Sequence, residues 1–322
     1  MRDLNLETAI WNLFTSSEFF EEAARECDRT MEWFGALAVA RKVANFGRNN
    51  QIYDTFKRRA REFRRGSELA KLGDYEFIWK VSDSIRGDAR GFLEQALHSW
   101  MTDGEERELN NVRMSRIFAY ASQITRALNN AMVKGDSFFD PDPDCPERAD
   151  DDDGFPGDEI VKVYESCSKL FDNGVWNLPA PLPEYRVDSS IACKTGEEVP
   201  QTGVWHPSVG LEQHSLTFAI KGRRMPPAFR VTKTVEELRA EGIWTGAETV
   251  AVATTWHLVL PVISPAATNN ELWAKAGQQC PKAGVWQTQD VNASERHFKL
   301  DEPMVDLGSA YGLTVWRWLR DR

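Results

Sequence analysis

The sequence lacks most of the motifs on which enzymes and metal proteins depend. Its 322 residues include five histidines and five cysteines, and neither set has the spacing of a metal site or a redox pair. The sequence also contains no glycine-rich phosphate loop and no Gly-x-Ser-x-Gly nucleophile turn. We therefore predict no catalytic residue, no metal ion and no cofactor.

Long apolar segments are missing as well. The longest apolar stretch runs from Thr249 to Ile263, contains His257 and Pro261, and is too short to span a membrane. The chain opens with Met-Arg-Asp-Leu-Asn-Leu-Glu, which has no apolar core of a secretory signal. The odd number of scattered cysteines favours free thiols in a reducing compartment. We therefore expect a cytoplasmic protein that does not interact with membranes.

A net positive charge is also lacking, because 49 acidic residues face 39 basic ones and the formal net charge is −10. Sequence-independent binding of nucleic acid needs a dominating positive field, so we expect no nucleic-acid partner. Basic residues do gather within residues 57–65 of one predicted helix. They either pair with neighbours such as Glu62 and Glu68 or form a strip that faces a partner protein. The candidate strip residues are Arg58, Arg61 and Arg65.

The clearest break in composition lies between residues 136 and 159, where eleven acidic residues face one basic residue, Arg148. Four prolines and two glycines share the segment, which predicts an extended, solvated linker over residues 136–157. An acidic contact for a basic partner is the alternative. A calcium loop fits less well, because Cys145 stands where such a loop needs glycine. The candidate contact residues are Asp142, Asp144, Asp150, Asp151, Asp152 and Asp153.

Proline is absent from the first 140 residues, which permits long uninterrupted helices. Apolar residues recur there at spacings of three and four, for example Trp33, Leu37 and Ala40. We therefore predict a helical bundle over residues 1–135, with a helix at 158–173 that packs back on it.

A ten-residue pattern occurs twice in the C-terminal half, 81 positions apart. The first copy, Gly196–Trp205, ends Val-Pro-Gln-Thr-Gly-Val-Trp, and the second, Gly277–Trp286, ends Cys-Pro-Lys-Ala-Gly-Val-Trp. Proline and glycine favour a tight turn, and Val-Trp favours the start of a half-buried strand. We interpret the copies as duplicated modules over residues 196–229 and 277–308. A Cys280–His297 dyad is not favoured, because Val199 replaces the cysteine in the first copy.

The modules contain matched residues that we predict to be structural anchors. In the first module these are Pro200, Gly203, Trp205, Phe218 and Met225. In the second they are Pro281, Gly284, Trp286, Phe298 and Met304, followed by Trp316 and Trp318 near the C-terminus. Eight of the 12 tryptophans lie beyond residue 170, which suits either a core of large side chains or an interface.

Strand-like segments follow residue 185 and predict a mainly antiparallel β domain over residues 185–322, so the whole chain is α+β. The predicted strands are Ser215–Ile220, Ala228–Thr232, Thr249–Pro261, His297–Leu300 and Leu313–Leu319. Thr234 and Glu237 have the spacing of a capping box at the start of a short helix, and Gly242 suits its end. We expect the two modules to pair into one sheet assembly that the last strand closes.

The paired modules and the C-terminal segment Tyr311–Trp318 resemble bacterial polymorphic-toxin immunity proteins of the Immunity protein 71 and Immunity protein 72 families. The resemblance covers roughly residues 190–322 and extends more loosely to the helical half. It implies a protein that is encoded beside a secreted toxin, often a type VI effector, and that binds and blocks this toxin without a reaction. An effector adaptor or chaperone is one alternative, and a hydrolase that reverses a toxin's modification is another.

Overall fold

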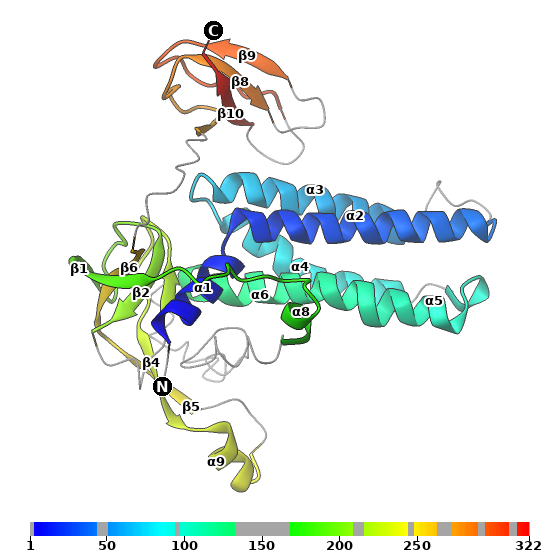
Figure 1. The fold of residues 1–322 in the computed structure, drawn as a ribbon, viewed down its shortest axis with the longest axis horizontal. Coiled ribbons are helices and arrows are strands. Elements are labelled where there is room, and N and C mark those ends of the chain that lie inside the picture. Colours follow the sequence, from blue (N-terminus) through cyan, green and yellow to red (C-terminus); the bar gives the residue numbers. More distant parts are fainter. Residues whose placement is uncertain are drawn as a thin grey trace, which may run out of the picture. The chain divides into compact units, whose positions relative to one another are not determined.

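A computed structural model of the chain describes residues 3–43, 51–93, 97–132, 168–208, 216–243, 248–262, 272–288, 294–308 and 314–321. Helices dominate the N-terminal part and antiparallel sheets the C-terminal part, which confirms the predicted α+β class (Figure 1). The predicted linker at 136–157 and most of the predicted helix at 158–173 lie outside the described residues; α8 (Ser168–Asp172) is the described part of that helix.

The chain forms two compact units, and neither coincides with a continuous half of the sequence. One unit combines Met1–Ser16 with Ser122–Ser264, and the other combines Ser17–Ala121 with Pro265–Arg322. Each unit therefore contains one of the two modules together with helices. The sequence-based division, which placed both modules in one β domain at 185–322, differs from this grouping because it followed composition along the chain.

The N-terminal helices begin at a well-defined cap. The carboxylate of Asp3 accepts hydrogen bonds from the backbone N–H groups of Asn5 and Leu6, which caps α1 (Leu4–Phe14). The helices that follow are α2 (Ser17–Ala40), α3 (Gln51–Ala70), α4 (Glu76–Leu93), the short η1 (Leu97–Ser99), α5 (Asp103–Arg107), the π-helical η2 (Glu108–Met114) and α6 (Ser115–Met132).

No helix among the described residues is long and apolar enough to cross a membrane.

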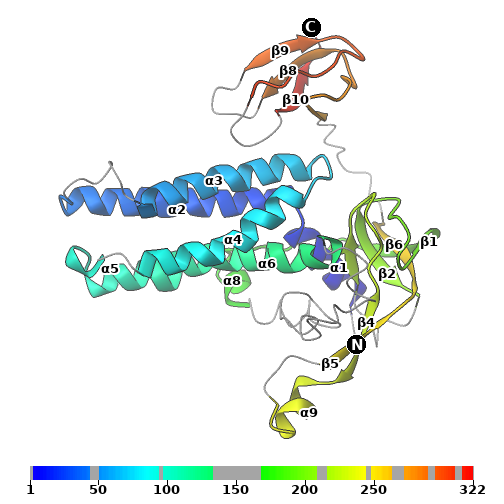
Figure 2. The same ribbon diagram turned by 180° about the vertical axis from the view of Figure 1, so that it is seen from behind.

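Helices α2 and α3 run side by side, as both views of the ribbon show (Figure 1, Figure 2). The buried face of α2 includes Phe20, Cys27, Phe34 and Ala38. The predicted face of Trp33, Leu37 and Ala40 is therefore wrong by one position: Trp33 and Leu37 are half-buried and Ala40 is exposed. The side chains of Phe20 and Phe34 are fully buried, so this face of the helix is the one that faces the core. The guanidinium of Arg113 covers the Trp33 ring at 4.5 Å.

The first sheet has the strand order β1-β6-β2-β3, with β1 at Tyr185–Lys194, β6 at Thr255–Pro261, β2 at Gly203–Pro207 and β3 at Thr217–Ala219. All neighbouring strands are antiparallel. The prediction of one continuous strand over Thr249–Pro261 is wrong. The segment contains two strands, because β6 pairs in this sheet whereas β5 (Glu248–Val252) pairs with β4 (Ala228–Lys233).

The second sheet has the order β7-β10-β8-β9, with β7 at Trp273–Lys275, β10 at Val315–Arg320, β8 at Gly284–Thr288 and β9 at Glu295–Phe298. Strand β10 lies between β7 and β8, so it is an interior strand and does not close an edge. The expectation that the modules pair into one sheet is also wrong, because no described strand of one sheet pairs with a strand of the other.

Strands β4 and β5 form a two-stranded ribbon that carries α9 (Val235–Ala240) at its far end (Figure 1, Figure 2). The predicted capping box is confirmed: Thr234 Oγ1 accepts from the Glu237 N–H, and the Glu237 carboxylate accepts from the Thr234 N–H. Gly242 has φ +81°, which ends the helix in the left-handed conformation that glycine tolerates best. We call residues 228–252, which comprise β4, α9 and β5, the arm.

Candidate functional site

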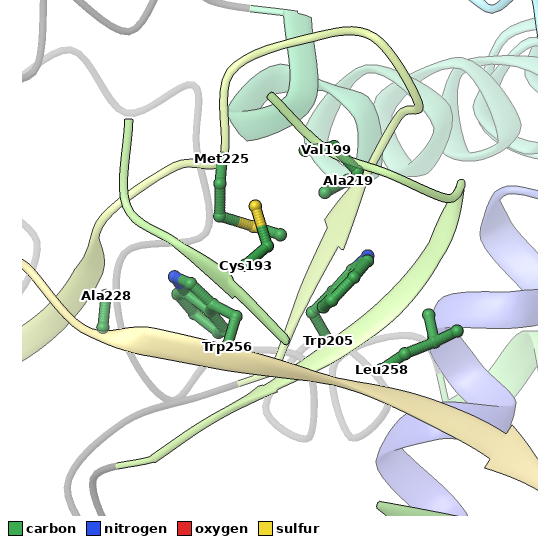
Figure 3. Packing of buried hydrophobic residues seen from close by; sticks show 8 residues of the cluster. All are labelled: Cys193, Val199, Trp205, Ala219, Met225, Ala228, Trp256 and Leu258. Atoms are coloured by element: carbon green, nitrogen blue, oxygen red, sulfur yellow. The ribbon is translucent and has the colours of Figure 1, made fainter. Parts of the chain in front are cut away.

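The two modules are built around cores in which six residues correspond in chain order. The first core is Cys193, Val199, Trp205, Ala219, Met225, Ala228, Trp256 and Leu258. Figure 3 shows the indole rings of Trp205 and Trp256 at the centre of this core, with the sulfur atoms of Cys193 and Met225 close by. The second core is Ala274, Cys280, Trp286, Phe298, Met304 and Trp316, with Trp318 packed against it. The predicted anchors Trp205, Met225, Trp286, Met304 and Trp316 are therefore core residues in this structure.

The backbone hydrogen bonds of the modules also match. The Gly196 N–H donates to the Met225 carbonyl at 2.8 Å, and the Gly277 N–H donates to the Met304 carbonyl at 2.7 Å. The indole Nε1–H of Trp256 donates to the Pro226 carbonyl at 3.0 Å, and that of Trp316 donates to the Val305 carbonyl at 2.9 Å. Because the acceptor is a backbone carbonyl, proline and valine can exchange at this position without loss of the bond.

Strand pairing corrects one predicted equivalence. Gly203 pairs with Ala219 in the first sheet, and Gly284 pairs with Phe298 in the second. The counterpart of Phe298 is therefore Ala219, and Phe218 lies one position away from the matched place. Both residues are buried, so hydrophobicity alone could not distinguish the two registers. The Phe298 ring lies edge-on to Trp316 at 4.9 Å between centroids.

The two turn prolines lie at the surface, whereas the cysteine of the second module is buried. Pro200 and Pro281 are exposed in their turns. Cys280 is fully buried, and its Sγ–H donates to the Lys282 carbonyl at 3.0 Å. Burial raises the pKa of the Cys280 thiol above its usual value, which disfavours the reactive thiolate. His297 is exposed on β9, so the structure gives no support to a dyad of these two residues.

The candidate arginine strip on α3 is mostly engaged within the protein. Arg65 is only 7% exposed and lies 3.3 Å from the Glu68 carboxylate. Arg58 lies 3.6 Å from Asp88 on α4, and Arg61 is exposed. Arg59, a neighbour of these candidates on the same helix, is buried and pairs with Asp88 at 2.6 Å and with Glu62 at 2.8 Å. The predicted ion pairs of this helix with Glu62 and Glu68 are thus confirmed. Of the three candidate arginines, Arg58 and Arg61 are exposed and could face a partner, whereas Arg65 is buried.

The other charged candidates lie outside the described residues. These are Asp142, Asp144, Asp150, Asp151, Asp152 and Asp153, and their role in partner contact stays a prediction.

The main difference between the modules is the arm. Met225 and Trp256 are 31 positions apart, whereas their counterparts Met304 and Trp316 are 12 apart. In the second module, hydrogen bonds to Asp306 Oδ1 hold the segment between Met304 and Trp316. The Gly308 N–H donates to this oxygen at 3.1 Å, and the N–H and hydroxyl of Thr314 donate to it at 3.2 and 2.9 Å. The same scaffold therefore closes without an arm in one copy, and the arm is an insertion in the other.

The arm exposes features that folded domains usually cover. Ile243, three residues after α9, is 42% exposed and Val250 on β5 is 40% exposed. Each ribbon strand has one strand partner among the described residues, so each presents a second edge that no described strand covers. Such edges are open to pairing with a strand from another chain. The arm was not predicted from the sequence, although the unequal spacings Met225–Trp256 and Met304–Trp316 indicate an insertion in the first module.

A second feature missed from sequence is a histidine pair on the first sheet. His206 on β2 and His257 on β6 are directly opposed across the strand pair. The Nε2 of His257 lies 3.1 Å from Ser208 Oγ, and its Nδ1 is buried without a hydrogen-bond partner among the described residues. The corresponding residues of the second sheet are Gln287 and Arg317, so the pair is particular to the first module. These histidines are 51 positions apart, and only the strand register brings them together.

Comparison of the chain with protein-family models, with curated proteins and with solved structures gives no match in any of the three.

Proposed function

We propose that this protein is an immunity protein that binds a cognate secreted toxin in the cytoplasm and neutralises it by stoichiometric occlusion. Two lines support the proposal. The repeated modules resemble toxin-immunity families, and the arm offers a surface suited to a protein partner. The arm is the observation that carries the proposal, because it is added to a scaffold that its own duplicate completes without it.

The arm, a two-stranded ribbon with one short helix, has few contacts of its own to stabilise it. A two-stranded ribbon is at best marginally stable in water, and its free edges and exposed apolar side chains invite contact with another chain. A partner could add a strand to the ribbon edge, which would pair its free backbone groups, or could provide a groove that buries Ile243 and Val250. The net charge of −10 favours a partner with a basic surface, since opposite charges speed association.

Two alternatives from other classes stay open. An effector adaptor would bind the same kind of partner but would leave the toxin active, so toxin activity in the complex distinguishes it from an immunity protein. A hydrolase would reverse a modification catalytically. A catalytic dyad of Cys280 and His297 would support a hydrolase. Cys280 is buried and His297 is exposed, so the structure does not support that dyad.

The arm can be tested by grafting the second module's shorter connection into the first. Replacing residues 229–253 by residues 308–313 keeps the core residue Ala228 and should leave the first sheet folded, because the flanking Pro226 and Thr254 correspond to Val305 and Thr314 in the backbone hydrogen bonds. We expect the graft to lose protection of cells that co-express the toxin encoded next to the gene. Circular dichroism and thermal unfolding would establish that the graft is folded.

Point variants sharpen the test. Ile243→Asp and Val250→Asp should each weaken toxin binding by about 2 kcal/mol, roughly thirtyfold, if they are central contacts. Leu300→Asp is the matched control, because Leu300 is 59% exposed in the second module and should leave binding unchanged. A folded graft that protects fully would show that the arm is not the binding surface.

A further inference from the structure

The outer face of the second sheet carries one row of side chains that continues across three strands. Trp316 is a core residue, and side chains alternate along a strand, so the adjacent Arg317 points to the face opposite the core. Arg317 is directly opposed to Trp273 on β7 and to Gln287 on β8. Directly opposed residues of antiparallel strands lie on one face of the sheet, so Trp273 and Gln287 flank Arg317 there.

Two cationic side chains share the indole ring of Trp273. The ammonium nitrogen of Lys71, the residue after α3, lies 4.2 Å from the ring centre, and the guanidinium carbon of Arg317 lies 6.0 Å from it. Because both distances are measured from one ring centre, the two charges lie within about 10 Å of each other. Lys71 is exposed and Arg317 is half-buried. The ring face attracts cations but has no net charge, so it neutralises neither of them.

The two cations at the indole ring have no counter-charge in the part of the chain that the structure describes. Neighbouring basic side chains are paired: Lys275 lies 2.5 Å from Asp74, and Arg320 lies 2.9 Å from Glu295. Neither cation at the indole has such an ion pair among the described residues. The Nε of Arg317 is buried and also has no hydrogen-bond partner there. A guanidinium stays charged in a folded protein, so a half-buried one without an acceptor is suited to an anionic partner.

The first sheet shows that the scaffold itself does not need this arrangement. The positions of Arg317 and Trp273 are occupied there by His257 and Ala192, which are opposed in the same way across β6 and β1. The tryptophan and its two cations are therefore particular to the second module, in a chain whose net charge is −10. Tryptophan and arginine are also the residues that dominate binding hot spots, so this composition favours recognition of a partner.

We propose that Lys71, Trp273 and Arg317 bind an acidic segment of a partner protein. The terminal guanidinium nitrogens of Arg317 hold one carboxylate through two parallel hydrogen bonds, and the ammonium group of Lys71 holds a second. In an extended segment, residues i and i+2 lie on one side about 7 Å apart, so two acidic residues with that spacing reach both cations. The site belongs to the unit that does not contain the arm, so it is independent of the proposed toxin contact.

The test measures binding of a fluorescein-labelled peptide of alternating glutamate and serine to the full-length chain, by fluorescence anisotropy at low salt. We expect saturable binding that weakens as the salt concentration is raised. Arg317→Gln should weaken it by at least about tenfold, and Lys71→Gln by about three- to tenfold, because each removes one carboxylate contact. Arg317→Lys should restore only part of the binding, because lysine keeps the charge but not the two parallel hydrogen bonds.

Lys282→Gln is the matched control. Lys282 also lies over an indole, 3.5 Å from the Trp318 ring centre, but Asp321 lies 3.6 Å away as its counter-charge. This variant and the graft without the arm should bind the peptide as the wild type does. Lys71 is exposed, so its variant tests the site even if the substitution of Arg317 impairs folding.

Unchanged affinity of the peptide for the Lys71→Gln, Arg317→Gln double variant would overturn the proposal. Absence of saturable binding up to about 1 mM peptide would overturn it as well. Tighter binding of inorganic tripolyphosphate than of the peptide would assign the two cations to a phosphate ligand and would overturn the assignment to an acidic protein segment.

Discussion

Trp286→Ala is expected to destabilise the unit that contains the second sheet by about 3–5 kcal/mol, and Trp205→Ala to do the same for the unit that contains the first. Both side chains have zero exposure and occupy equivalent places in their cores. Their removal leaves cavities lined by neighbours that cannot fully collapse. A loss of this size is a large fraction of the stability of an ordinary domain. Urea unfolding followed by tryptophan fluorescence and by far-ultraviolet circular dichroism measures it.

The two tryptophans differ in one contact, which provides a finer test. The Trp286 Nε1–H donates to the Lys282 carbonyl at 3.0 Å, whereas the Trp205 Nε1 is buried without a hydrogen-bond partner among the described residues. Trp286→Phe should therefore cost more than Trp205→Phe, by roughly 1 kcal/mol, the usual net contribution of one hydrogen bond. Trp273→Ala is the control for both alanine variants, because Trp273 is only half-buried and belongs to neither core cluster. Alanine variants that unfold like the wild type but lose partner binding would identify the tryptophans as interface residues.

Gly284→Ala is expected to destabilise the second sheet by about 2–4 kcal/mol, through backbone strain and overpacking together. Gly284 has φ +146°, a conformation that residues with a side chain rarely adopt. A Cβ atom there would lie 2.5 Å from Trp318 Nε1 and 2.6 Å from the Arg320 carbonyl oxygen. The strand pair of β8 and β10 would have to separate next to the irregularity in its register between Trp318 and Arg320.

Gly203→Ala is the matched control at the equivalent place of the first module. A Cβ atom there would meet only Leu258 Cδ1, at 3.1 Å, and the end of a leucine side chain can move. We expect it to cost less than about 1 kcal/mol, with thermal unfolding as the measurement. Equal effects of the two substitutions would mean that the close approach of β8 and β10 does not contribute to stability.

Local signals in the sequence predicted local structure well. The Thr234–Glu237 spacing gave the capped helix at its observed place, because a capping box is satisfied within one turn. The α+β class followed from the proline-free N-terminal region and the β-branched C-terminal region. Strands β1 and β7 were not predicted. Strand β1 has no regular alternation of buried and exposed residues and contains a bulge between Asp188 and Ala192, and β7 has only three residues.

These local signals could not predict which distant segments pair as strands. The choice between Ala219 and Phe218 as the counterpart of Phe298 depends on a shift of one residue, and both are buried. The assignment of the two modules to separate sheets depends on contacts between distant segments. The same holds for the pair of His206 and His257, which carries no spacing motif because its members lie on different strands. Candidate sites built from strand register therefore appear only when the fold is known.

Neutralisation by stoichiometric binding can be measured by titrating the toxin's activity with this protein. Inhibition should increase linearly and reach completion at a fixed molar ratio, with a stable complex on size-exclusion chromatography. A lasting complex of this kind buries at least about 1,200 Å² in total. Full protection by amounts far below the toxin's own concentration would show turnover and would rule out neutralisation by stoichiometric binding.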